Sequence, residues 1–133
     1  MDASAPVGAG ARARGVLGET LACLFLESRG YTIVARNLRL GRNEIDLIAE
    51  RSALLVAVEV KWRRVGGVRP GTDGAWSIAQ RRRAREAVLG AMAALEDGAK
   101  RPWRFDLVTI EEDATGFKLE HRRGVWSPRG TYW

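Results

Sequence analysis

The chain has 133 residues, 46% of them hydrophobic, and a formal net charge of +6 at pH 7. This length is typical of one domain and is enough to bury a hydrophobic core. Nearly all of the positive charge is arginine, because Lys61, Lys100 and Lys118 are the only lysines. Guanidinium groups bind phosphates in a planar, bidentate geometry, so the charge favours a polyanionic partner. A compositional bias of the source genome would produce the same excess.

The residues that the chain lacks exclude several classes of site. Cys23 is the only cysteine, which excludes an internal disulfide and a cysteine-rich zinc site. His121 is the only histidine, so a metal site must be built mainly from carboxylates. No apolar run approaches the roughly 18 residues of a transmembrane helix, and residues 1–15 lack the apolar core of a secretory signal. We therefore expect a cytoplasmic protein without membrane contact.

The predicted elements begin after residues 1–14, which we expect to be a disordered basic arm. Val16 to Arg29 has the apolar spacing of a helix, and Gly30 is a plausible stop. This helix has two apolar stripes, one formed by Leu17, Leu21, Leu24 and Phe25, the other by Glu19, Ala22, Cys23 and Leu26. Two apolar stripes predict a well-buried helix, with Glu19 pointing inward.

Three strands are predicted next, at Tyr31–Asn37, Glu44–Ala49 and Ala53–Lys61. Their short connections favour an antiparallel meander. The third strand alternates, with Leu54, Val56, Val58 and Val60 on one face and Leu55, Ala57, Glu59 and Lys61 on the other. Because both faces begin apolar, this strand is expected to be central and covered on both sides.

The remaining elements complete one domain over residues 15–123. Arg63 to Gly74 is predicted to be a glycine-rich loop, and Ser77 to about Leu95 a second helix with Ser77 as its N-cap. Its expected apolar face holds Ala84, Val88, Ala91 and Leu95, and a closing hairpin is predicted at Arg104–Ile110 and Gly116–Arg122. Residues 124–133 form an aromatic tail, which could dock on a second subunit in a homodimer.

Charged residues gather where the second and third strands should pair. Asp46 shares a strand face with Glu44 and Ile48, while Glu59 and Lys61 share a face of the next strand. A turn centred near residue 51 would set Asp46 opposite about residue 57, diagonal to Glu59. Two carboxylates about 4 Å apart repel by roughly 4 kcal/mol at an effective dielectric near 20. We therefore expect the pair to take up a proton or a cation.

This pattern predicts a metal-dependent site that cleaves phosphodiesters. Oxygen ligands without histidine or cysteine select a hard ion, Mg²⁺ or Mn²⁺, held by Asp46 and Glu59. Lys61 could orient or deprotonate a water, or stabilise the transition state, and Glu19 could add a further ligand. The alternative is an ordinary ion pair between Glu59 and Lys61 beside a solvated Asp46, because short acid and lysine patterns also occur by chance.

Basic and aromatic residues flank this site in the sequence. One interpretation is that the arginines grip nucleic-acid phosphates, and the other is that they form solvated surface. They are Arg63, Arg64 and Arg69 of the loop, with Arg81, Arg82 and Arg85 of the second helix. Trp62 and Trp76 bracket the loop and could stack on unpaired bases or cap the core.

The motifs together resemble a known family. They are Gly18-Glu19, Gly30-Tyr31, Ala35-Arg36-Asn37, Glu44-Ile45-Asp46-Leu47-Ile48, Val58-Glu59-Val60-Lys61 and Arg104-Phe105-Asp106. In this order, over roughly residues 15–122, they resemble the YraN family of small bacterial proteins. That family is similar to the restriction-endonuclease-like, PD-(D/E)XK nucleases and to the Holliday-junction resolvases among them. The resemblance implies an α/β fold with an α-β-β-β-α-β core, in which a mixed central sheet is flanked by helices.

The resemblance also implies roles for particular residues. Asp46, Glu59 and Lys61 match the motif acids and lysine, and Glu19 matches a helix glutamate of many such nucleases. Gln80 matches a polar position near the site of related resolvases, although a solvated helix residue is the alternative. The implied activity is a Mg²⁺- or Mn²⁺-dependent endonuclease acting on DNA, in repair or recombination. The rival hypotheses are a non-catalytic nucleic-acid-binding module and a protein adaptor, each retaining the nuclease fold.

Overall fold

The computed structural model describes residues 11–64 and 78–126. The elements are α1 (Ala11–Ser28), β1 (Thr32–Leu40), β2 (Asn43–Arg51), β3 (Leu54–Arg64), α2 (Ile78–Ala94), a short 3-10 helix (Gly98–Lys100), β4 (Trp103–Asp113) and β5 (Gly116–Trp126). The strands form one sheet in the order β1-β2-β3-β4-β5. β3 and β4 are parallel and the other neighbours are antiparallel. The predicted mixed sheet with an α-β-β-β-α-β core is confirmed.

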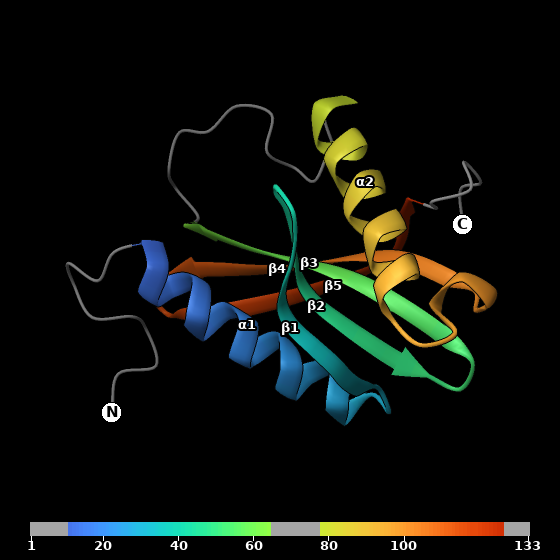
Figure 1. Ribbon diagram of the computed structural model, residues 1–133. Coiled ribbons are helices and arrows are strands. Elements are labelled where there is room, and N and C mark those ends of the chain that lie inside the picture. The colour runs from blue at the N-terminus through green and yellow to red at the C-terminus, as the bar shows by residue number, and fades with distance from the viewer. Residues whose placement is uncertain (1–10, 65–77, 127–133) are drawn as a thin grey trace.

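The two helices lie on opposite faces of the sheet (Figure 1). α2 packs on the face that holds Leu55 and Ala57, and α1 packs on the face that holds Val56 and Val58. All four of these β3 side chains are buried. The alternation predicted for the third strand is therefore confirmed, because a central strand with a helix on each face must be apolar on both faces at its middle.

The expected burial of α1 on two sides is wrong. Ala22, Cys23 and Leu26 of the second stripe are buried, but Leu24 of the first stripe is 61% exposed. α1 covers a single sheet and has no described element on its other side, so Leu24 faces solvent, while Leu21 and Phe25 of the same stripe still pack against the edge of the core. None of the helices in residues 11–28 and 78–94 is long and apolar enough to cross a membrane.

Several element boundaries differ from those expected. α1 begins at Ala11, inside the segment expected to be an arm, and β5 continues to Trp126, inside the expected tail. Arg63 and Arg64 belong to β3 rather than to a loop, because they still pair in register with Glu111 and Glu112 of β4. The expected N-cap at Ser77, together with Arg69 and Trp76, lies outside the described residues.

A buried ionic network ties β4 to β5 on the α1 side of the sheet. Asp106 is fully buried and accepts two hydrogen bonds of 2.7 Å from Arg104. It also lies 2.8 Å from Nε2 of His121 and accepts from the Gly124 N–H at 2.9 Å. Arg104 in turn donates to the Tyr31 hydroxyl at 2.7 Å. The only histidine therefore has a structural partner.

Candidate functional site

The site lies where β2 and β3 separate. Their ladder runs from Arg51 opposite Leu54 to Leu47 opposite Val58 and ends there. Beyond that point β2 continues to pair with β1, while β3 continues to pair with β4. Continuing the register by one residue sets Asp46 opposite Glu59, not opposite residue 57 as the sequence suggested. The corrected register places the two residues on the same face of the sheet, directly across from one another rather than on a diagonal.

The Asp46 side chain bridges the gap between the separating strands. Its Oδ2 accepts a hydrogen bond of 2.9 Å from the backbone N–H of Val60. Burial raises the pKa of Asp46, and the charge of Glu44 raises it further, against the lowering effects of the Val60 N–H and Lys61. The net shift is upward, so Asp46 is a carboxylate whose charge the protein compensates only in part.

Glu59 and Lys61 form a loose pair rather than a tight ion pair. Their Oε1 and Nζ atoms are 3.9 Å apart, and their side chains are 36% and 39% exposed. Burial raises the pKa of Glu59 and Asp46 adds to that rise, while Lys61 and Arg83 oppose it. A half-exposed pair at this distance contributes little stability. Both groups therefore remain available to a ligand.

α1 adds a third carboxylate from the opposite face of the sheet. Oε1 of Glu19 is buried and has no hydrogen-bond partner among the described residues. Burial raises the pKa of Glu19 and the nearby charge of Asp46 raises it further, against the lowering effects of a side-chain hydrogen bond with Asn37 and the charge of Arg36. α1 packs closely on β3 here, because a Cβ added at Gly18 would lie 3.4 Å from Trp62 and 3.5 Å from Val60. Glu19 thus points inward, as its stripe predicted.

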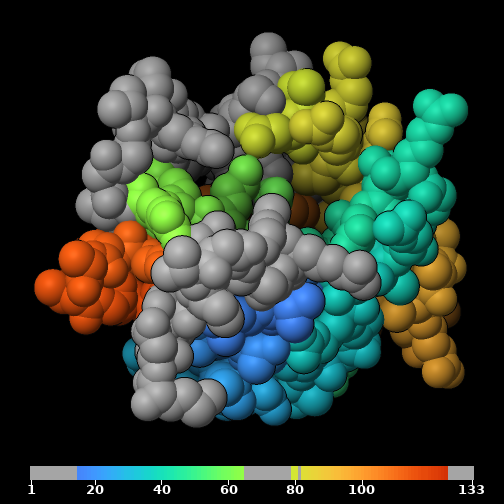
Figure 2. Space-filling model, turned by 90° about the vertical axis from the view of Figure 1, so that its left-hand side faces the viewer, coloured from blue at the N-terminus to red at the C-terminus, as the bar shows by residue number. Residues whose placement is uncertain are grey.

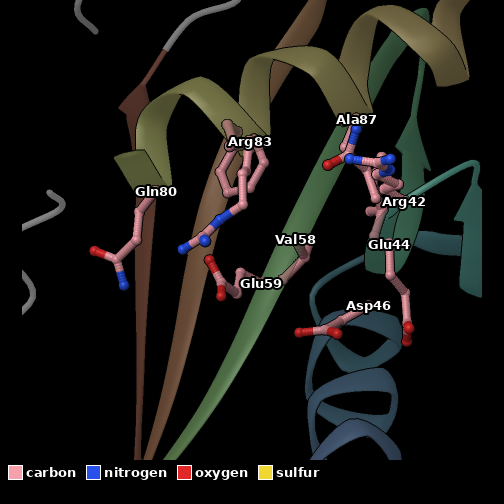
Figure 3. Close-up of a pocket in the computed structure, with 12 residues that line it drawn as sticks. Arg42, Glu44, Asp46, Val58, Glu59, Gln80, Arg83 and Ala87 are labelled. Carbon is pink, nitrogen blue, oxygen red and sulfur yellow. The ribbon is translucent and has the colours of Figure 1, made fainter. Parts of the chain in front are cut away.

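A pocket of about 260 Å³ opens beside Asp46 and Glu59 (Figure 3). Its lining comes from the β1–β2 turn, β2, β3, β4 and α2. The lining residues are Arg42, Asn43, Glu44, Ile45, Asp46, Val58, Glu59, Gln80, Arg83, Ala84, Ala87 and Phe105. Figure 2 views the end of the molecule that carries the last residues of β3 (green) and the first turns of α2 (yellow). Gln80 lines the pocket, as the family resemblance implied.

Arg83 is the pocket arginine that the sequence interpretation did not single out among those of the second helix. It lies on the pocket wall, and in Figure 3 its guanidinium points toward the Glu59 carboxylate. The spacing of Gln80, Arg83, Ala84 and Ala87 places these residues on one face of a helix. The predicted apolar position Ala84 does not by itself distinguish Arg83 from the other arginines of this helix, because Arg81 lies three residues before it.

Of the other predicted phosphate-binding arginines, the four whose side chains are described do not line the pocket. Arg63 bonds to Glu111 at 2.9 Å, and Arg64 lies 3.7 Å from Glu112, so β4 acids compensate both. Arg82 and Arg85 are exposed on α2 and are not among the pocket-lining residues. The side chain of Arg81 and all of Arg69 lie outside the described part of the chain.

Trp62 caps the core. Its Nε1 donates to Glu112 at 2.9 Å, and its ring packs edge to face on Phe117, with centroids 5.0 Å apart. It also packs against the hydrophobic cluster between α1 and the sheet. Of its two interpretations, the structure therefore supports capping rather than base stacking.

The donor set fits a hard divalent cation through carboxylate oxygens. Asp46, Glu59 and Glu19 supply only oxygen atoms, and one of these, Oε1 of Glu19, is buried without a partner. Each of the three carboxyl groups has a raised pKa, which a cation would relieve. Within residues 11–64 and 78–126, no three acidic, histidine or cysteine side chains converge closely enough to form a complete metal site. Water or substrate oxygens would have to complete the coordination shell, as is usual for Mg²⁺.

Comparisons with known proteins give the family. Residues 18–110 match the model of uncharacterised protein family UPF0102. A UPF0102 protein of Symbiobacterium thermophilum is 41% identical over 102 residues, covering 77% of this chain and 85% of its own. One of Chlorobaculum tepidum is 36% identical over 121 residues, covering 84% and 90%. A solved structure of Pyrococcus furiosus SfsA in complex with Ca²⁺ has a TM-score of 0.37 and 16% identity, over 84% of this chain and 61% of that one. The match to SfsA is too weak to support an inference, but the family match establishes that this chain belongs to UPF0102, the YraN family.

Proposed function

We propose that this protein is a metal-dependent endonuclease that hydrolyses phosphodiester bonds in DNA. The observation that carries the proposal is the convergence of Asp46, Glu59 and Lys61, with Glu19 behind them, where β2 and β3 separate. Burial and mutual repulsion raise the pKa values of these carboxylates. Carboxylates with raised pKa values are found more often at functional sites than at structural ones. The restriction-endonuclease-like fold of the family is consistent with this activity, although fold alone does not imply function.

In this proposal the carboxylates hold a divalent metal ion, and the ammonium group of Lys61 acts on the water and the phosphate. Asp46 and Glu59 would bind Mg²⁺ or Mn²⁺, with Glu19 contributing directly or through a water. The ion would supply positive charge beside the phosphate and a more acidic bound water. Lys61 stands 3.9 Å from Glu59, where its ammonium can orient the attacking water and offset charge that develops on phosphate oxygens.

The charge of the chain supports nucleic acid as the substrate. The net charge of +6 attracts polyanions, and Arg82 and Arg85 present exposed guanidinium groups on α2 near the pocket residues Gln80 and Arg83. Phosphate contacts of this kind position a nucleic acid without reading its sequence. A role in repair or recombination, on branched DNA, follows from the similarity of the family to resolvases.

The proposal is tested by cleavage of labelled single-stranded, duplex and four-way-junction DNA with Mn²⁺, Mg²⁺ or a chelator. The wild type is compared with Glu59→Gln and with Glu96→Gln, which removes an exposed carboxylate far along the chain from the site. Cleavage that requires metal, is lost in Glu59→Gln and survives in Glu96→Gln is the expected result. Metal-independent cleavage, or equal cleavage by all three proteins, would contradict the proposal.

A second candidate function is a nucleic-acid-binding module without catalysis. It is favoured by the incomplete convergence of the carboxylates, since no three candidate ligands among the described residues are close enough to enclose a metal. This alternative predicts DNA binding that weakens steeply with salt but is indifferent to metal and to Asp46. Cleavage in none of the reactions, together with such binding, would favour it.

A further inference from the structure

The pocket beside the carboxylates has two chemically different parts. Its mouth is charged, because Arg42, Glu44 and Arg83 are exposed and Asp46 and Glu59 are partly exposed. Its inner lining is apolar and buried, and consists of Ile45, Val58, Ala84, Ala87 and Phe105. The pocket therefore offers two guanidinium groups beside three carboxylates at its mouth, and an apolar surface further in.

Two arginines stand at the mouth from different elements. Arg83 comes from the first turns of α2 and Arg42 from the turn between β1 and β2 (Figure 3). Among the described residues, neither forms an ion pair within 4.0 Å, whereas Arg63, Arg64 and Arg104 each have an acidic partner at shorter distance. The positive charge of Arg83 lowers the pKa of Glu59 through space, without an ion pair within 4.0 Å. These two guanidinium groups are therefore available to an anion at the mouth.

We infer that the pocket binds one unpaired nucleotide of a DNA strand, with its phosphate at Arg83 and its base against Ala84, Ala87 and Phe105. This inference rests on the proposed function, because the nucleotide would lie beside the phosphodiester that Asp46 and Glu59 act on. Arg83 is then a substrate-binding residue that holds a phosphate next to the reacting one.

The size and the lining of the pocket favour an unpaired nucleotide over a duplex. The volume of the whole pocket, about 260 Å³, lies just below the usual range of ligand pockets, which suits one nucleotide better than a base pair with its two backbones. A paired base must leave its stack to enter such a pocket, which costs a few kcal/mol, and an already unpaired base avoids most of that cost. Strands with an unpaired base should therefore bind about tenfold or more tightly than a fully paired duplex.

The test is binding rather than cleavage, measured by fluorescence anisotropy in the presence of a chelator. The labelled probes are a fully paired duplex, the same duplex with one bulged nucleotide, and the same bulge with an abasic residue. The proteins are the wild type, Arg83→Ala, Arg83→Lys, and Arg123→Ala. Arg123 is an exposed β5 residue outside the pocket lining, so its removal matches the charge change of Arg83→Ala.

We expect the bulged duplex to bind the wild type about tenfold more tightly than the paired and abasic probes. Arg83→Ala should remove most of this difference, Arg83→Lys should restore part of it, and Arg123→Ala should leave it unchanged. Equal affinity for all three probes, or equal effects of Arg83→Ala and Arg123→Ala, would overturn the inference. Because this binding assay needs neither metal nor cleavage, failure of the inference can be told apart from failure of the endonuclease proposal.

Discussion

Replacing Asp106 by asparagine should destabilise the fold strongly. Asp106 is fully buried and receives bonds from Arg104, His121 and the Gly124 N–H at 2.7–2.9 Å. Asparagine keeps the shape but leaves the guanidinium of Arg104, only 16% exposed, without its counter-charge. Breaking a buried ion pair on one side costs about 3–5 kcal/mol. Asparagine still accepts a hydrogen bond, so we expect a loss of about 3 kcal/mol, or a Tm lower by roughly 10 °C.

Urea denaturation at pH 7, followed by circular dichroism, measures this loss, with Glu96→Gln as an exposed control that should change stability by less than about 0.5 kcal/mol. The effect also depends on pH. Burial alone would raise the pKa of Asp106, but His121, Arg104 and the Gly124 N–H hold it below its usual value of 3.8. The wild-type advantage is therefore complete above that value and shrinks as the pH falls below it. A loss under about 1 kcal/mol at pH 7, or an advantage that persists in strong acid, would refute this reasoning.

Three further predictions concern single residues. Asp46→Asn should raise Tm at pH 7, because burial penalises the charged carboxylate and raises its pKa, whereas asparagine is neutral and still accepts the Val60 N–H bond. This gain in Tm should vanish as the pH falls below 3.8, the pKa of the carboxyl in the unfolded chain. Trp62→Phe should lower the free energy of unfolding by about 1 kcal/mol, through loss of the bond to Glu112. Gly30→Ala should cost about 1 kcal/mol, because Gly30 has φ +88°. Thermal and urea denaturation of each variant check these values, and an unchanged transition would contradict the physical reason given for that variant.

The sheet could be predicted in outline because its strands carry strong patterns, but its register could not. β3 is apolar on both faces, and from this pattern the sequence predicted that both faces of the sheet are covered, as they are by α2 and α1 in the structure. The β2–β3 turn was misplaced by about one residue, because the strands are joined after Arg51 through Ser52, which takes φ 54°. Serine gives no sequence signal for a left-handed turn, unlike the Asn-Gly or Asp-Gly pairs common in such hairpins.

The acids of the site were predictable, but the arginine that faces them was not. Asp46, Glu59 and Lys61 lie on neighbouring strands, so alternation and pairing alone bring them together. Arg83 stands among several arginines of similar local sequence, and only the orientation of α2 on the sheet distinguishes it. That orientation depends on tertiary packing of Ala84 and Ala87, which short-range patterns do not fix.

The central claim is that Asp46 and Glu59 form a divalent metal centre, and Mn²⁺ binding tests it without assuming a substrate. Electron paramagnetic resonance of free Mn²⁺ would be followed during titration of the wild type, Asp46→Asn, Glu59→Gln and Glu96→Gln. One binding site in the wild type and in Glu96→Gln, tighter as the pH rises and lost in the other two variants, is the result we predict. No binding by the wild type, or binding that neither Asp46→Asn nor Glu59→Gln weakens, would contradict the account.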